Sequence, residues 1–488
     1  MEKIKIGWSE IDITPDEPIK LAGQFYERVS DSVDSPLTCT AFALESGDEQ
    51  MVLCSCDLAS LTKDIINAAK EKIKGKVEGL DLDKIVFSAI HSHTSYVYPR
   101  KTSLSYLKQV IPEDMPYVSL STGKKSMEDS KVWEIITTGM ANAVIEAWNS
   151  RGKGYYQNAF GRVAVGMCRR ACYDDGSAKM WGETNLANFT ELEGGNDSGM
   201  ELIYTFDENK ELNGVIANIA CPAQVAEHRD FVSADYWGRV KQNLEKKFGK
   251  RIFVLGLCSA AGDQCPRDLI RWVDPESPVK DPNIKHYYPV ERRAGPSMFD
   301  KSGLTLVGKR ITNEIVNVYE ELDDNKLDEA VLVHETINLL QPLRRATIAE
   351  YEESVKKIDE FVEKNRGKEI NYEDSARLYI YAGTIDRYIK QQTMDNYDIE
   401  VHIIRFGDIA IATNPYELFL DYGNQIRARS QAKQTFLIQL ACDSLGYLPT
   451  EKAEKGGHYS AYISSGWTGH EGGDILVRET LKRINKMF

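Results

Sequence analysis

Short apolar runs that alternate with longer amphipathic runs constrain the fold of this chain more than any other feature of its sequence. The short runs are rich in Val, Ile and Phe, and such composition is typical of buried strands. We expect strands at 51–56, 85–90, 215–221, 252–257, 409–413 and 436–441. Apolar residues at helical spacing predict helices at 61–73, 132–148, 234–248, 304–319 and 417–430. The alternation predicts an α/β fold class with a mixed α+β core.

The length of the chain leaves its domain organisation open. Its 488 residues permit one large α/β domain with an insertion, or two to three ordinary domains. Because we find no repeat of fixed period and no low-complexity linker, we expect one domain over 1–488. The charge-rich segment 346–392 shows two helical stretches joined by Asn-Arg-Gly-Lys. We predict that this segment is a helical hairpin inserted between core strands.

The net charge limits the classes of molecule that the chain can bind, and the cysteine content indicates its redox environment. The formal charge of −14 disfavours nucleic acid and anionic membrane surfaces. No stretch has the apolar length of a membrane span or of a signal-peptide core. The nine cysteines contain no Cys-x-x-Cys pair, which excludes a zinc ribbon and fits reduced thiols. We expect a cytoplasmic protein that binds a small molecule, without stable membrane association, and the oligomeric state stays open.

Two long irregular segments, 96–130 and 263–302, are rich in Pro, Asp, Arg and Tyr. Loops of this length in a compact enzyme usually cover or form a binding site. We therefore predict that they border the site, and loops without a functional role are the alternative.

The sequence Ile-His-Ser-His-Thr at 90–94 directly follows a predicted strand. Residues i and i+2 of an extended segment point to the same side, so the imidazoles of His91 and His93 can reach one point. The carboxyl end of a strand is where α/β proteins place their sites. Two histidines are half a zinc site. A packed or hydrogen-bonded histidine pair is the alternative interpretation.

Three further stretches follow predicted strands. Gly-Asp-Gln-Cys-Pro-Arg at 262–267 presents a carboxylate, a thiol and a guanidinium in a small-residue loop, or is a tight turn with a capping Asp. Asn-Pro-Tyr-Glu at 414–417 either begins a helix with Glu417 in a capping box or places a metal-binding carboxylate at a strand end. Tyr447, between Gly446 and Pro449, is either a surface residue or presents its phenol to a cation.

Taken in order, these stretches resemble the amino-terminal catalytic domain of the neutral, non-lysosomal ceramidases and their bacterial relatives. The resemblance covers nearly the whole chain. It begins at Gly-Trp-Ser-Glu-Ile-Asp-Ile-Thr-Pro at 7–15 and includes Asp57 and the His-Ser-His-Thr stretch. It continues through Cys-Arg-Arg at 168–170 and Ser-Ala-Asp at 233–235. The stretches together are far more specific than any one alone.

The resemblance implies hydrolysis, most simply of an amide, assisted by one Zn²⁺ per chain; ester, lactone and glycosidic bonds stay open. It implies that His91, Glu417 and Tyr447 are zinc ligands. His93 would act beside the metal as a general acid–base or oxyanion partner. Arg169 would bind a substrate oxygen. Two aspartates, Asp57 and Asp263, would orient the imidazoles.

Two departures from the family pattern affect the site. The stretch that carries the second zinc histidine reads Asn-Ile-Ala-Cys-Pro-Ala-Gln at 218–224. We take His228 as the substitute ligand, with Cys221 as its rival, since a thiolate also binds zinc. Cys265 stands where the family has a catalytically important serine. A metal-free thiol hydrolase that uses Cys265 with His93 is therefore one alternative. A non-catalytic metal- or saccharide-binding protein, with Trp181, Trp237 or Trp467 stacking on sugars, is another.

Ceramide is not the substrate that we expect. Docking on a lipid surface calls for an exposed apolar or basic face, and the chain carries a charge of −14. The two irregular segments suit a polar molecule with hydroxyl or carboxylate groups, held by Arg169 or Arg267.

Overall fold

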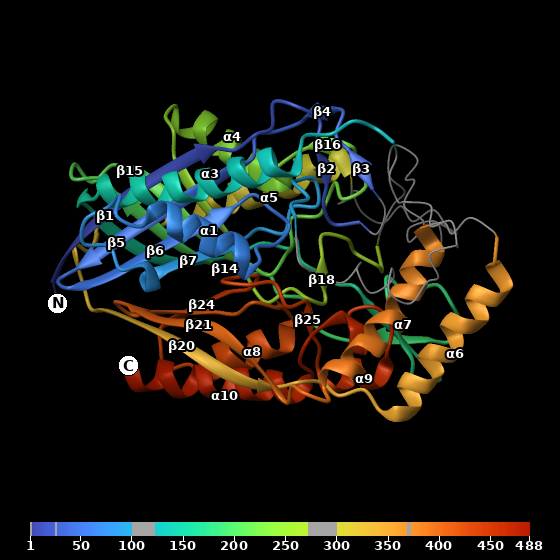
Figure 1. Cartoon of the computed structure of the whole chain (residues 1–488). Helices are drawn as coiled ribbons and strands as arrows, with labels where there is room; N and C mark the ends of the chain where they lie inside the picture. The colour runs from blue at the N-terminus through green and yellow to red at the C-terminus, as the bar shows by residue number, and fades with distance from the viewer. Residues whose placement is uncertain (1, 25–26, 100–122, 272–299, 368–371) are drawn as a thin grey trace.

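A computed structural model describes residues 2–24, 27–99, 123–271, 300–367 and 372–488 of the chain. Most of the irregular segments predicted at 96–130 and 263–302 lies outside these residues. The described part is built from three principal β-sheets with helices on their outer faces (Figure 1). The α/β fold class predicted from the sequence is confirmed.

The first sheet has the strand order β19-β1-β5-β6-β7, with β8 paired to β1. β1, β5 and β6 are antiparallel, and β7 joins β6 in parallel after the crossover helix α1. The helix α3 then packs against β1 and β5. The bounds are β1 (Glu2–Asp12), β5 (Thr38–Ser46), β6 (Glu49–Cys56), α1 (Lys63–Ile73), β7 (Ile85–Ala89), α3 (Asp129–Asn149), β8 (Gly152–Lys153) and β19 (Glu329–Ala330).

The second sheet repeats this topology with the strand order β9-β14-β15-β17. Two antiparallel pairings are again followed by a crossover helix, α4, and a parallel strand, β17. The helix α5 follows. The bounds are β9 (Tyr155–Arg162), β14 (Gly199–Phe206), β15 (Leu212–Ile219), α4 (Asp235–Phe248), β17 (Phe253–Cys258) and α5 (Asp300–Glu320).

The third sheet has the same topology again, in the order β20-β21-β22-β24, with α8 as the crossover and α10 as the last helix. The bounds are β20 (Leu332–Pro342), β21 (Asn396–Phe406), β22 (Ile409–Thr413), α8 (Leu420–Arg429), β24 (Gln434–Ile438) and α10 (His470–Met487). The three sheets share a topology, but the sequence shows no repeat of fixed period, because loops and insertions of different length separate the equivalent elements.

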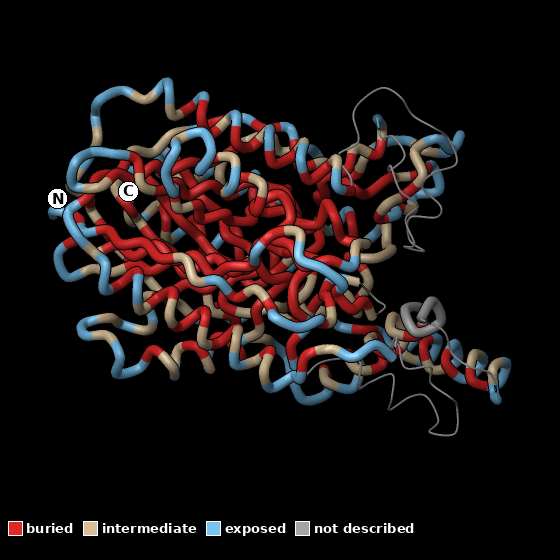
Figure 2. The backbone as a smooth tube through the Cα atoms, turned by 90° about the horizontal axis from the view of Figure 1, so that it is seen from above, coloured by how far each residue is buried: buried red, intermediate tan, exposed pale blue. Residues whose placement is uncertain are grey.

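The inner faces of the three sheets meet in one apolar cluster. Figure 2 shows that buried residues fill the interior of the molecule. Members of the cluster include Ile6, Phe42, Leu53, Ile203, Ile216, Leu255, Ile404, Ile411 and Phe436. Full burial of such side chains contributes about 1.5–3 kcal/mol each, so the contact between sheets is a major source of stability. The outer faces are covered by α1 and α3, by α4 and α5, and by α8 and α10.

The helical hairpin lies between β20 and β21 and projects from the body of the molecule (Figure 1). Helix α6 (Ile348–Asn365) begins with a capping box between Thr347 and Glu350. Helix α7 (Tyr372–Lys390) packs against α6 through a small apolar cluster of its own. None of the helices in the described ranges has the combination of length and apolar character that a bilayer span requires.

Candidate active site

Each of the three sheets, together with its crossover helix and its last helix, forms one unit of the fold. Polar side chains from all three units meet beyond the carboxyl ends of the parallel strand pairs. His91 comes two residues after the end of β7, and Glu227 lies in the segment that connects β15 to α4. The third unit supplies Glu417 in β23 (Glu417–Leu418) and Tyr447 in β25 (Tyr447–Leu448). These two short strands pair in parallel with Glu417 opposite Tyr447. The threefold topology thus brings together residues that are far apart in the sequence.

A backbone carbonyl beside His91 fixes which nitrogen carries the hydrogen in the neutral ring. His91 has a φ of 70°, an uncommon value for a residue other than glycine, and the chain turns sharply there. Its Nδ1 lies 2.7 Å from the carbonyl oxygen of Ala59, which can only accept a hydrogen bond. In the neutral ring Nδ1 therefore carries the hydrogen and Nε2 carries the lone pair.

Two further polar atoms face the Nε2 of His91. The Nε2 of His93 lies 3.2 Å away and the Oε2 of Glu417 lies 3.4 Å away. A carboxylate oxygen and an imidazole lone pair are both acceptors, so a cation between them is the arrangement that satisfies both. Nitrogen and oxygen ligands on a tetrahedral zinc ion are about 3.3–3.5 Å apart, given bonds of about 2.0–2.2 Å. The residues present therefore fit a metal ion.

A carboxylate lies on the other side of His93. Its Nδ1 lies 3.1 Å from Oε2 of Glu227, and Arg28 donates a hydrogen bond to its backbone carbonyl. Burial, together with His91 and Arg28, holds the pKa of His93 well below its usual range. Burial also raises the pKa of Glu227, against the opposing effect of nearby arginines. His93 is thus a neutral imidazole with one edge toward Glu227 and the other toward His91.

A buried arginine joins the carboxylate and the phenol of the site. Nη2 of Arg169 donates to the carbonyl of Gly262 at 3.1 Å and to the hydroxyl of Tyr447 at 3.3 Å. The same atom lies 3.9 Å from Oε2 of Glu417. Tyr459 is hydrogen-bonded to Tyr447, with 3.3 Å between the two hydroxyls. His91, Glu417, Tyr447 and Arg169, four residues selected from the sequence, therefore share one site.

Cys265 lies in β18 (Gln264–Cys265), which pairs with β10 (Met167–Cys168) beside Arg169. Burial raises the pKa of Cys265 to about 12, although Arg169 and Arg267 oppose this shift. Its Sγ lies 3.3 Å from the carbonyl oxygen of Arg267. A thiol with this pKa is protonated at neutral pH and is a poor nucleophile, which disfavours a thiol hydrolase.

The two aspartates expected to orient the imidazoles lie elsewhere. Oδ1 of Asp263 accepts from the backbone N–H of Leu420 at 2.9 Å, at the first turn of α8. Asp57 accepts from the backbone and the hydroxyl of Thr38 and from Lys241. These contacts give Asp263 the role of a helix cap and Asp57 the role of an ion-pair partner. The carbonyl of Ala59 orients His91 instead.

The structure places His228 beside an aspartate. Its Nε2 lies 3.8 Å from Oδ1 of Asp300, which forms an ion pair with Arg229 at the start of α5. Burial lowers the pKa of His228 to about 3. The preceding residue, Glu227, contacts His93, and sequence reasoning missed it. The rival ligand Cys221 points its Sγ toward the carbonyl of Val165 at 3.5 Å.

The helix predicted at 417–430 begins later than expected. Glu417 lies in β23, the N-cap of α8 is Phe419, and the helix starts at Leu420. The capping-box interpretation of Glu417 is therefore wrong. Pairing of β23 with β25 removes Glu417 from the helix and directs it toward His91.

The tryptophans considered for sugar stacking have protein partners. Trp237 is buried in the core of the second unit. Trp181 lies under two guanidinium groups, 5.7 Å from that of Arg169 and 5.3 Å from that of Arg267. Trp467 packs against Arg387 and Lys390 of α7.

The three-sheet framework, with its polar residues at the strand ends, is a neutral-ceramidase-like α/β fold. It is similar to the neutral ceramidase from Pseudomonas aeruginosa, with a TM-score of 0.69 and 14% identity over 100% of this chain and 75% of that one. A ceramidase complexed with C2 gives a TM-score of 0.70 and 12% identity over the same shares. No protein-family model and no curated protein matches the sequence. At these identities the likeness shows the fold alone.

Proposed function

We propose that this protein is a metal-dependent hydrolase that cleaves an amide bond in a polar small molecule. The proposal rests on the distance of 3.4 Å between Oε2 of Glu417 and Nε2 of His91. The other ring nitrogen of His91, Nδ1, donates to the carbonyl of Ala59. A histidine that donates its second N–H to a backbone carbonyl is the usual arrangement of a metal ligand. The neutral-ceramidase-like fold supports the same chemistry.

His91 and Glu417 would hold the ion, and Tyr447 would complete the protein ligands. Zinc suits this set of nitrogen and oxygen donors best. When bound, such an ion polarises a carbonyl oxygen and lowers the pKa of water. Because Nε2 of His228 lies beside Asp300, the proposed ligand set does not include it.

The remaining residues would position the substrate and move protons. His93, a neutral imidazole with Glu227 beside its Nδ1, would exchange a proton at Nε2, a role worth about 10²–10⁴-fold in rate. Arg169 is fixed by the carbonyl of Gly262 and the hydroxyl of Tyr447, and its guanidinium would bind an oxygen of the substrate.

A polar substrate follows from the charges around the site. Arg28, Arg169, Arg267 and Glu227 are all buried there. An apolar chain placed against such charged groups would displace water and offer no hydrogen bond in exchange, at a cost of about 1–3 kcal/mol for each hydrogen bond lost. We therefore propose that ceramide is a poor substrate, and that Arg169 and Arg267 bind carboxylate or hydroxyl groups. Nine free cysteines support a reducing, cytoplasmic location.

Elemental analysis and a hydrolase assay on three variants test the proposal. His91→Ala should lose about one equivalent of metal and all activity, because it removes a ligand. His93→Gln should keep the metal and lose about 10²–10⁴-fold in kcat. His470→Ala, at a surface histidine paired with Glu454, is the matched control and should change neither.

The substrate assay compares polar amides and esters with short- and long-chain ceramides. A kcat/KM on ceramide above about 10⁴ M⁻¹s⁻¹ would overturn the substrate assignment. Full metal content in His91→Ala would overturn the metal assignment.

A further inference from the structure

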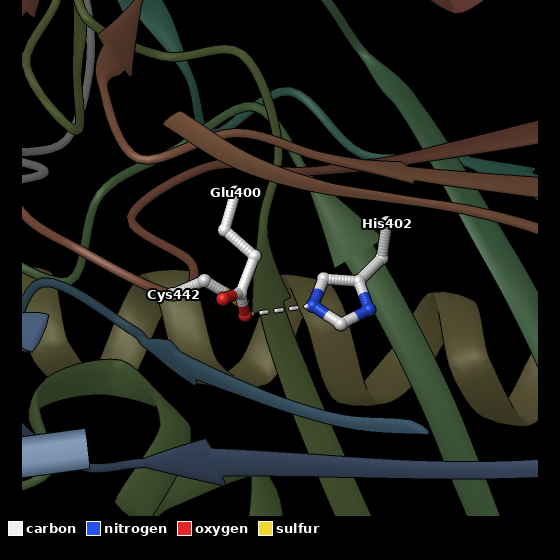
Figure 3. A group of neighbouring side chains, drawn as sticks. All are labelled: Glu400, His402 and Cys442. Atoms are coloured by element: carbon white, nitrogen blue, oxygen red, sulfur yellow. Dashed lines mark hydrogen bonds and ion pairs between the residues drawn. The ribbon is translucent and has the colours of Figure 1, made fainter. Parts of the chain in front are cut away.

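A second group of metal-binding side chains lies outside the active site. Glu400 and His402 come from β21, and Cys442 comes from the segment between β24 and β25 (Figure 3). Their donor atoms, one oxygen, one nitrogen and one sulfur, all lie within 4.8 Å of one another. His402 and Cys442 are buried, with 0% and 3% of their surface exposed.

A chain of hydrogen bonds fixes the hydrogens on His402. Nδ1 of His334 lies 3.0 Å from the carbonyl of Gln50 and must donate to it, so its Nε2 accepts from Nδ1 of His402 at 2.8 Å. The hydroxyl of Thr336 donates to the carbonyl of Asp83 at 2.6 Å, which leaves its oxygen to accept from the same Nδ1 at 3.2 Å. Both contacts require a hydrogen on Nδ1 of His402.

The other nitrogen of His402 then presents a lone pair to a carboxylate. Nε2 of His402 lies 3.2 Å from Oε1 of Glu400, and the thiol of Cys442 lies beside them. Two acceptors at this distance need a positive species between them. A proton would place an imidazolium where no part of the side chain reaches solvent, which costs free energy. A metal ion satisfies nitrogen, oxygen and sulfur together.

We propose that Glu400, His402 and Cys442 form a second transition-metal site, most suited to zinc. Donor atoms on a tetrahedral zinc ion lie about 3.3–3.8 Å apart, so small side-chain rotations would close the present spacing. His334 and Thr336 orient the imidazole from behind, as hydrogen-bonding partners of metal ligands commonly do. Nζ of Lys70 lies 3.8 Å from Oε1 of Glu400 and adds positive charge beside the carboxylate.

The position of the site indicates a structural role. The backbone N–H of Cys442 donates to the carbonyl of Phe87 in β7, whereas His402 belongs to the third sheet. A bound ion would join the third sheet to a segment anchored on the first. The same segment leads into β25 and Tyr447, so the ion would also help to hold the phenol of the active site.

Cobalt(II) substitution tests this proposal separately from the proposed function. A cobalt ion bound by Cys442 should give a thiolate-to-cobalt charge-transfer band in the near ultraviolet, whereas the ligands His91, Glu417 and Tyr447 contain no sulfur. The band should be lost in Cys442→Ala and persist in His91→Ala. Cys172→Ala, at a free and partly exposed cysteine, is the matched control and should keep the band.

Zinc-edge X-ray absorption of the unmodified protein needs no variant. We expect one sulfur neighbour at about 2.3 Å for the zinc of this site. Metal-loaded protein without a sulfur neighbour, or a cobalt band that survives in Cys442→Ala, would overturn the proposal. Neither result would bear on the metal of the active site, which His91→Ala measures.

Discussion

Glu191 and Glu193, two positions apart in the sequence, should differ sharply in their contribution to the free energy of unfolding. Glu193 forms a bidentate ion pair with Arg170, through contacts of 2.5 Å to Nε and 3.0 Å to Nη2. Arg170 is wholly buried and also donates to the carbonyls of Ala453, Gly457 and Tyr459 and to the hydroxyl of Ser460. Glu191, by contrast, pairs with Lys452 at the surface, where both side chains are more than half exposed.

Glu193→Ala would leave a buried guanidinium without its counter-ion. Removing one partner of a buried pair costs about 3–5 kcal/mol, because the remaining charge is desolvated and uncompensated. Glu191→Ala removes an exposed pair worth about 0–1 kcal/mol. Chemical denaturation of both variants, followed by far-UV circular dichroism, measures the two changes in the free energy of unfolding. Equal costs for the two variants would refute this assignment of the stability to the buried pair.

Three further predictions concern pH, the position of His93 and cooperativity. Although burial opposes the shift, Lys241 and Arg251 hold the pKa of Glu10 at about 2, below its usual value of 4.5. The stability from this lowered pKa is present above about pH 4.5 and is lost as the pH falls toward 2, so Glu10→Gln should show a weaker loss of stability over that range than the unmodified protein. Gly23 has a φ of +91°, and Gly23→Ala would place a methyl group 2.2 Å from Cγ of His93. Displacement of the His93 ring should reduce kcat by about 10²-fold with the metal retained. An unchanged kcat would contradict the role of His93. We propose that residues 1–488 form one domain, because one core cluster contains residues of all three sheets. Thermal unfolding followed by circular dichroism and by tryptophan fluorescence should therefore give one shared midpoint. Two separate midpoints would count against a single domain.

The strands that the sequence predicted are the parallel pairs of the three sheets. β6 and β7, β15 and β17, and β22 and β24 are buried on both faces, so they read as continuous apolar runs. β20 and β21 were missed, since they carry polar residues such as Glu335, Asn338 and Asp398 among their apolar ones. A threefold topology without a repeated sequence leaves no periodic signal to detect.

In the candidate site, too, residues placed by local sequence were predictable, whereas residues placed by contacts between distant segments were not. His91 and His93 were predictable because a strand end and a spacing of two residues place them together. The choice between Glu227 and His228 depends on which of two adjacent side chains points inward, which tertiary packing decides. Glu417 required the pairing of β23 with β25, a contact between distant segments that no local pattern encodes.

Anomalous diffraction tests whether His91 and Glu417 hold a metal ion. Crystals of protein purified without chelator and supplied with zinc are measured on both sides of the zinc absorption edge. We expect an anomalous peak within about 2.0–2.2 Å of both Nε2 of His91 and Oε2 of Glu417. Zinc-loaded crystals with no anomalous peak between these two atoms would contradict it.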